Sequence, residues 1–383
     1  FVGSIDRNAL PFSVLRKVGN LTYDGEKIMD RYDPSNPSIK WQRQENRNIG
    51  FDASLFNNRV NLVVNYYNND TRNLLDEKKI AASTGRLAVT ANVASVNNKG
   101  WEISLRTLNI RTDDFSWVTS VNFTKNKDKV TETYYQDLSE ISASTNSTFE
   151  SLYSLYIQGQ PVRAFYGYKF AGVDPYTGNT LAYVDGFDDD GNRLGMLNAE
   201  GKYVYNMDND LTVQLANASR SYLGRSDPPI TGGFTTQFNY KRFSLFAQFT
   251  YMTGHLARSF QYYSGGTAYA AAKNVLKIEA NRWRKPGDLT DIPRYDTGRT
   301  EYLYQLFDFR FEKGDYLKCN NISLGYNLEQ SICVKLHITR ARLNFNMANV
   351  FTVTRFRGID PETKGAFTYP SARSYTFSLS IGI

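Results

Sequence analysis

The chain has 383 residues, of which 41% are hydrophobic and 14% aromatic, and its formal net charge is +7. Its mean hydropathy of −0.48 and the lack of a long apolar run exclude membrane-spanning helices. Lysine and arginine form no basic run with interleaved aromatic residues, so we expect no nucleic acid partner.

The first 46 residues show no sustained alternation of polar and apolar residues, and we expect them to form loop. Phe1-Val2-Gly3-Ser4 lacks the charged start and apolar core of a signal peptide. For an exported protein, this would place the natural N-terminus upstream. Period-two alternation, which predicts a strand, begins in Asn48 to Leu55 and resumes in Val60 to Asn68 after a tight turn at Phe56-Asn57-Asn58.

A long polar connection over 70–98 leads to a predicted strand with Trp101, Ile103 and Leu105 on one face. The next strand, 115–123, follows a short turn at Asp113-Asp114. The Ser/Thr/Asn-rich segment 127–149 predicts loop, and two further strands are expected at 150–157 and 163–171, on either side of Gly159-Gln160-Pro161.

The clearest hairpin covers Gly232 to Tyr251. Phe234, Phe238 and Tyr240 alternate with polar residues, and the pattern continues after a break at Lys241-Arg242. Each arm has about ten residues, which is the length that a tilted strand needs to cross a bilayer, whereas soluble sandwich strands average about five or six. The hairpin therefore predicts a membrane barrel with its apolar face toward lipid.

Long insertions are expected on both sides of this hairpin, at 172–229 and 252–315. The last predicted strands are 322–328, 343–347 and 375–383, which brings the number of strands to eleven. Their connections alternate between short and long, as in a membrane barrel with short periplasmic turns and longer extracellular loops. We therefore predict an all-β fold, an antiparallel transmembrane β-barrel with long extracellular loops and a periplasmic C-terminus.

An odd number of strands indicates part of a larger barrel, because single-chain bacterial barrels have even numbers and an open edge leaves backbone groups unsatisfied in lipid. Composition alone fits a tyrosine-rich soluble β-sandwich equally well. The two cysteines, Cys319 and Cys333, are expected at an outer strand end and in an inner turn, too far apart for a disulfide, and we predict two free thiols.

Many motifs in register resemble the C-terminal half of the SusC-like TonB-dependent transporters. They include Asn48-Ile49-Gly50-Phe51-Asp52, Asn98-Lys99-Gly100-Trp101-Glu102-Ile103, Gly172-Val173-Asp174-Pro175, Arg282-Trp283 with Pro286-Gly287-Asp288, Asn321-Ile322-Ser323-Leu324-Gly325-Tyr326 and Gly358-Ile359-Asp360-Pro361-Glu362. Two departures are a terminal Ile383 in place of an aromatic residue and Cys319 in place of an apolar one.

The resemblance implies a barrel of about 22 strands, of which residues 1–383 are the C-terminal part. The N-terminal plug and the first half of the barrel would then lie upstream. The resemblance further implies energy supplied by TonB, a SusD-like surface lipoprotein that closes over the barrel, and an oligosaccharide or peptide cargo.

Catalysis is not expected, because His255 and His337 lie in no triad or metal-binding pattern. The acidic run from Asp185 to Asp190 resembles a calcium loop, but Leu197 stands where an EF-hand needs Glu. A solvated turn is the preferred interpretation, with an irregular calcium site as the alternative. We expect no metal and no cofactor.

Cargo contact is expected from the aromatic residues of the 252–315 insertion, namely Tyr262, Tyr263 and Trp283. Aromatic faces stack on the apolar faces of sugars, but these residues could equally pack the loop onto itself or hold a lid protein. Apolar residues at helical spacing over 268–284 also suggest a short helix.

The function predicted from the sequence is active import of an oligosaccharide or oligopeptide across the outer membrane. The alternatives are a passive porin or structural barrel, and a soluble glycan-binding β-protein.

Overall fold

The computed structural model describes residues 2–4, 14–23, 26–33, 36, 38–79, 88–133, 157–184, 196–198, 201–206, 221–258, 277–295, 307–362 and 369–383. Among these residues no helix is long and apolar enough to cross a membrane.

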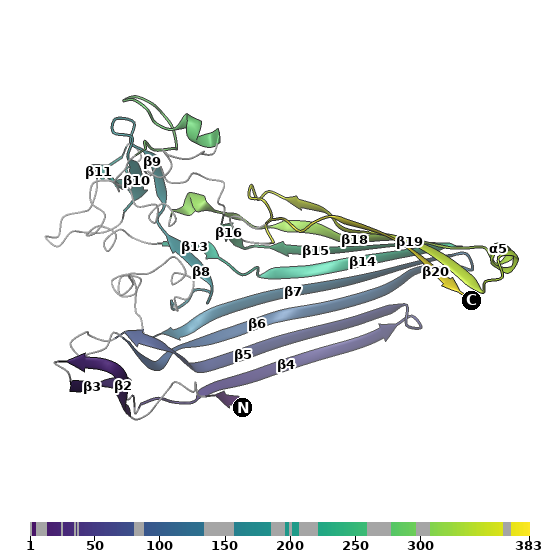
Figure 1. Ribbon diagram of the computed structural model, residues 1–383, viewed down its shortest axis with the longest axis horizontal. Coiled ribbons are helices and arrows are strands. Elements are labelled where there is room, and N and C mark those ends of the chain that lie inside the picture. The colour runs from purple at the N-terminus through teal and green to yellow at the C-terminus, as the bar shows by residue number, and fades with distance from the viewer. Residues whose placement is uncertain are drawn as a thin grey trace. The chain divides into compact units, whose positions relative to one another are not determined.

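The largest element is a ten-stranded sheet (Figure 1). Its strands, in spatial order, are β1 (Val2–Ser4), β4 (Gln42–Leu55), β5 (Val60–Lys79), β6 (Ala88–Arg111), β7 (Phe115–Thr133), β14 (Ile230–Tyr240), β15 (Phe243–Thr253), β18 (Tyr316–Asn327), β19 (Arg340–Thr354) and β20 (Ser374–Gly382). Spatial order follows chain order, and the registered pairs are antiparallel, so the sheet is a meander with β1 and β20 at its two edges. This confirms the predicted antiparallel all-β fold and shows a sheet that is not closed.

The alternation in the sequence explains the register of these strands. β14 and β15 pair without a shift from Ile230↔Thr253 to Tyr240↔Phe243. Where β15 meets β18, the register shifts at Gln248/Phe249 and Asn320 is the extra residue of a β-bulge. The bulge brings Cys319 opposite Phe249, on the face that carries the aromatic residues.

One predicted strand does not join this sheet. β7 pairs directly with β14, and residues 164–173 form short strands elsewhere, so a barrel strand at 163–171 is wrong. Its predicted partner at 150–157 lies outside the described residues except for Ile157, which is not in a strand. Losing two successive strands leaves the alternation of short and long connections intact.

The strands next to the N-terminus are longer than the sequence indicated. β5, β6 and β7 have 20, 24 and 19 residues, which leaves only 80–87 between β5 and β6 in place of the predicted connection over 70–98. β2 (Val14–Tyr23) and β3 (Glu26–Asp33) pair as antiparallel strands where loop was expected. Their pairing register shifts at Val14/Leu15 and Lys17/Thr22, and the sequence of these irregular strands has no sustained polar–apolar alternation from which to predict them.

Short elements occupy the long connections. β8 (Ala164–Gly167) pairs with β13 (Ser221–Arg225), and β16 (Leu256–Arg258) with β17 (Phe311–Lys313). A four-stranded sheet has the order β11 (Met196–Leu197), β12 (Tyr203–Asn206), β10 (Thr180–Tyr183), β9 (Phe170–Val173). Among the described residues, the helices are η3 (Lys277–Asn281), η4 (Asp308–Arg310) and α5 (Gln330–Lys335). The helix expected over 268–284 is thus reduced, in its described part, to the single 3₁₀ turn η3.

Two compact units divide the chain. The first contains Phe1–Asn48, Tyr67–Lys99 and Lys127–Val162, and has a small core of Ala91, Val93 and Ala94 with Leu74. The second contains Ile49–Tyr66, Gly100–Asn126 and Arg163–Ile383.

Candidate functional site

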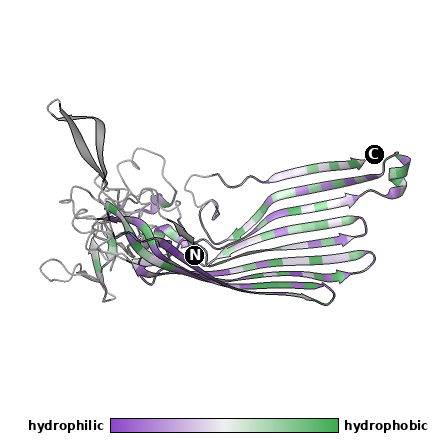
Figure 2. Cartoon of the chain, turned by 90° about the horizontal axis from the view of Figure 1, so that it is seen from below, coloured by the Kyte–Doolittle hydropathy of each residue, from purple (hydrophilic) through white to green (hydrophobic). Residues whose placement is uncertain are grey.

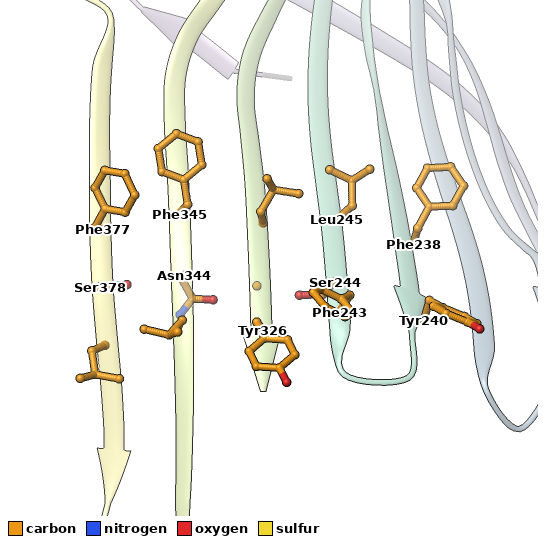
Figure 3. A pocket seen from close by; sticks show the side chains of 14 residues that line it. Phe238, Tyr240, Phe243, Ser244, Leu245, Tyr326, Asn344, Phe345, Phe377 and Ser378 are labelled. Carbon is orange, nitrogen blue, oxygen red and sulfur yellow. The ribbon is translucent and has the colours of Figure 1, made fainter. Parts of the chain in front are cut away.

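One face of the sheet in the second unit carries continuous rows of apolar side chains. A single cross-strand row, read through the registered pairs, consists of Trp117, Phe238, Leu245, Leu324, Phe345 and Phe377. The neighbouring row consists of Phe115, Tyr240, Phe243, Tyr326, Leu343 and Leu379. Figure 3 shows part of both rows, with Phe238, Leu245, Phe345 and Phe377 of the first and Tyr240, Phe243 and Tyr326 of the second labelled. We call this surface the apolar belt.

The rings of the apolar belt contact one another but are not covered. Trp117 and Phe238 stack with centroids 5.4 Å apart, and Phe345 and Phe377 lie at 4.8 Å. Phe377 is nevertheless 79% exposed and Phe243 61% exposed. A groove of about 620 Å³ runs along these residues. Because these aromatic rows are exposed on a single sheet, the fold is not a sandwich that buries them between two sheets. A continuous exposed apolar surface of this kind is stable only in contact with an apolar environment.

The opposite face carries hydroxyl and amide groups. In the rows between those of the apolar belt lie Ser116, Asn239, Ser244, Gly325, Asn344 and Ser378. Asn239 Nδ2 donates to Ser116 Oγ at 3.0 Å, and Arg342 donates to Ser244 Oγ at 3.0 Å and to Asn344 Oδ1 at 2.8 Å. We call this surface the polar wall.

The two faces together give each strand the alternating hydropathy visible along the ribbons in Figure 2. Backbone N–H and C=O groups pair between neighbouring strands, and the two edge strands, β1 and β20, each leave one side unpaired. Such a sheet can separate hydrocarbon from water, with the apolar belt toward lipid and the polar wall toward an aqueous lumen.

The short elements of the long connections have an aromatic core of their own. Tyr168 and Phe307 are fully buried with ring centroids 5.9 Å apart, and Phe165 lies 4.5 Å from Phe311. Asp308 fastens β9 to η4, because its carboxylate accepts the Phe170 N–H at 3.0 Å. Burial raises the pKa of Asp308, an effect that the hydrogen bond from Phe170 opposes. These connections are therefore folded in their described parts.

Trp283 is the one predicted cargo residue among those described, since Tyr262 and Tyr263 lie outside the described residues. Its indole Nε1 donates to the carbonyl of Pro175 at 2.8 Å, and its ring covers Gly178 so closely that no Cβ would fit. Trp283 thus joins the Gly172–Pro175 motif to the Arg282–Asp288 motif. Packing of this kind was the alternative to cargo contact, and cargo contact stays a prediction.

Glu279, Arg282 and Tyr295 form a cluster close to Trp283 that the sequence analysis did not predict. Glu279 is fully buried and accepts a hydrogen bond of 2.8 Å from the Tyr295 hydroxyl, while the guanidinium of Arg282 lies 4.3 Å from the centre of the Tyr295 ring. Burial and the contact with Glu279 raise the pKa of Tyr295. These residues come from a 3₁₀ turn and from extended chain without periodicity, so no pattern could have selected them.

The structure also places the two histidines and the two cysteines that the sequence analysis considered. His255 is buried and His337 lies beyond the end of α5, and no group of three potential metal ligands occurs among the described residues. The acidic run from Asp185 to Asp190 lies outside the described residues. Cys319 on β18 and Cys333 in α5 are buried free thiols, which confirms that prediction.

Comparison with known proteins matches this architecture. Residues 19–187 match the family described as TonB dependent receptor-like, beta-barrel. TonB-dependent receptor P3 of Formosa agariphila is 26% identical over 96% of the chain and 36% of its own length. TonB-dependent receptor SusC of Bacteroides thetaiotaomicron is 24% identical over 90% of the chain and 32% of its length. The chain thus spans about a third of these curated relatives.

A solved structure of the RagAB peptide importer in its closed-closed state superposes with a TM-score of 0.74 at 25% identity, covering 98% of this chain and 38% of the other. The family match over residues 19–187, the named relatives and the superposed structure show that this chain has the fold of a TonB-dependent receptor β-barrel and is similar in sequence to receptors of that kind, SusC among them.

Proposed function

We propose that the chain is the C-terminal part of the barrel of an outer-membrane importer that draws energy from TonB. The observation that carries the proposal is the open meander with an apolar belt on one face and a polar wall on the other. Open edges at β1 and β20 are consistent with completion of the ring by a preceding half-barrel, with a plug further upstream.

In the proposed orientation, the short turns and the C-terminus lie in the periplasm. The C-terminal end of β20 lies at the same end of the strands as the turns that join β6 to β7 and β14 to β15 (Figure 1). The long connections would then be extracellular, where they can meet cargo and a SusD-like lipoprotein. Trp283, with Tyr262 and Tyr263, is proposed to contact cargo there.

The proposed cargo is an oligosaccharide or an oligopeptide. Support for a peptide comes from the likeness to the RagAB peptide importer, and support for a glycan from the relative named SusC. The hydroxyl and amide groups of the polar wall suit both, because sugars and peptides exchange hydrogen bonds with such groups as they pass.

Growth and uptake measurements on the full-length transporter test this function. A strain that lacks the gene should lose uptake of one labelled oligosaccharide or oligopeptide, and a TonB-deficient strain should lose the same uptake. Uptake that persists without TonB, with linear dependence on concentration, would support the passive porin instead. A full-length protein that stays monodisperse in water without detergent would contradict both barrels.

A further inference from the structure

Lys318 places a nearly buried cation on the same face of the sheet as the polar wall. Its register partner on β15 is Thr250, which lies on the face of Ser244, and its partner on β19 is Thr352. The side chain of Lys318 is only 7% exposed. A lysine is rarely buried without an anionic partner, because its charge is costly to remove from water. The sheet therefore presents a cation that requires a carboxylate or another anion beside it.

The segment 355–362, which follows β19, lies against this part of the sheet, and we call it the strap. Near its start, the Arg357 backbone N–H and Nε both donate to Glu312 Oε2 of β17, at 3.0 and 3.3 Å. The neighbouring Phe356 is buried, and its N–H donates to Thr354 Oγ1 at 3.0 Å. This part of the strap is thus fixed by main-chain hydrogen bonds and by packing.

The far end of the strap reaches Lys318 through a side chain. Glu362 Oε2 accepts a hydrogen bond from Lys318 Nζ, and the Glu362 N–H donates to Asp360 Oδ1 at 2.9 Å. The Glu362 side chain is 40% exposed, although the lysine that it meets is nearly buried. The cation is therefore fixed in a strand, whereas the anion comes from a connection and is open to solvent. Such a contact can open locally, and another carboxylate can take the place of Glu362.

Tyr316 adds an unused hydrogen-bonding group next to Lys318. It precedes Lys318 by two residues on the same face of β18, which is about 7 Å along the strand. Tyr316 is 6% exposed, and its hydroxyl has no hydrogen-bond partner among the described residues. A buried polar group without a partner is destabilising, and Glu362 leaves this one unsatisfied. A carboxylate that is not tethered to the strap is free to accept hydrogen bonds from both Lys318 and Tyr316.

We propose that Lys318 is the cation of a carboxylate-binding subsite on the face of the polar wall, and that Glu362 occupies this subsite until a carboxylate of the cargo replaces it. The proposal rests on the proposed function, which places this face toward the lumen. It narrows the cargo to molecules that carry a carboxylate, because a neutral molecule has no group with which to displace Glu362. The strap would leave Lys318 as such cargo passes, and Glu362 would return afterwards.

Isothermal titration calorimetry on the full-length transporter in detergent tests the subsite with two probes. The peptide triglutamate and the sugar trigalacturonate carry carboxylates from the two sources. E362Q should bind at least one probe about fivefold more tightly than the unmodified protein, because the competing carboxylate is gone. K318Q should bind the same probe about tenfold more weakly, since a charge-assisted hydrogen bond is lost, and K318R should keep most of the affinity. The probe that responds identifies the source of the carboxylate.

Two controls separate the cation from general effects of charge and space. K335Q removes an exposed lysine from α5 and should change the affinity for either probe by less than about twofold, because salt screens distant charges. Triglutamine amide, which has no carboxylate, should bind equally to the unmodified protein, to E362Q and to K318Q. A gain for triglutamine amide in E362Q would show that the strap only blocks space, and would overturn the proposal.

The gain of affinity in E362Q is the decisive result, because a misfolded sheet cannot produce it. No gain for either probe overturns the subsite. Uptake by cells with and without TonB tests the proposed function separately. Normal TonB-dependent uptake without a gain in E362Q refutes the subsite alone, whereas a gain in E362Q without TonB-dependent uptake refutes active import alone.

Discussion

Gly178 and Trp283 show how single residues hold a long connection in shape. Gly178 has φ +73° and lies under the indole, while its amide donates to Asp174 O at 2.8 Å. Gly201 has a nearly identical φ of +75° but has open space around its Cα. Substituting alanine at each of the two glycines therefore distinguishes the cost of left-handed backbone, which both share, from the cost of overlap with the indole, which only Gly178 has.

We expect Gly178→Ala to destabilise the folded connections by about 2–4 kcal/mol, because left-handed backbone costs about 1 kcal/mol and overpacking about 1–3 kcal/mol more. Gly201→Ala should cost about 1 kcal/mol. Limited proteolysis of the purified transporter measures the difference as faster cleavage in the long connections. Equal cleavage rates for the two variants would show that the indole does not confine Gly178.

The ion pair between Arg242 and Glu329 supports a pH prediction at the short-turn end. Arg242 Nη2 lies 2.9 Å from Glu329 Oε1, and this hydrogen bond lowers the pKa of Glu329 below its usual 4.5. A lowered carboxyl pKa means that the pair's contribution to stability is present above about pH 4.5 and is lost as the pH falls through the folded pKa.

Glu329→Gln should therefore lower the Tm slightly at pH 7, and the difference from the unmodified protein should shrink at an acidic pH below 4.5. Both side chains are exposed, so salt should also reduce the difference. Thermal unfolding in detergent at the two pH values and at two salt concentrations measures it. A difference that grows on acidification would contradict the assigned direction.

At the scale of the strand, position on one face or the other decides what a substitution costs. Ile322 pairs with Ala247 and Met347 in the row next to the apolar belt on the same face, whereas Ser323 pairs with Phe246 and Asn346 on the opposite face. Ile322→Lys should cost about 2–4 kcal/mol of folding in lipid, the penalty for lysine near the bilayer midplane, and Ser323→Lys about 0–1 kcal/mol. Urea titration of folding into vesicles compares these adjacent variants, and equal costs would refute the assignment of faces.

The same alternation explains how much of the fold the sequence could predict. Phe243, Leu245, Ala247, Phe249 and Tyr251 predicted β15 because every other side chain must meet the apolar environment. The β8 to β13 elements have strands of two to five residues that pack on each other through local contacts, and no period of two can develop over such lengths. Trp283 was selected for its residue type, but its contact with Gly178 depends on a tertiary fold that residue type does not encode.

Whole-molecule topology predicts where each end of the sheet is accessible. Asp114 and Lys241 lie in short turns, while Lys285 lies in a long connection. In intact cells, a membrane-impermeant maleimide should label Lys285→Cys in the full-length transporter and should leave Asp114→Cys unlabelled until the outer membrane is opened. Buried Cys319 and Cys333 should remain unlabelled and serve as the internal control. Labelling of Asp114→Cys alone in intact cells would reverse the proposed orientation.

The pairing of β7 with β14 has a consequence for how such proteins diversify. β7 ends at Thr133, and the next strand of the ten-stranded sheet, β14, starts at Ile230 directly beside it. Residues 134–229 therefore form one long connection between two neighbouring strands. The entropy of closing a loop grows only logarithmically, and each doubling of its length costs about 0.6 kcal/mol. Related proteins can therefore lengthen, shorten or exchange this connection at little cost in folding free energy. They can change the ligand that they recognise while the strands of the barrel wall stay the same.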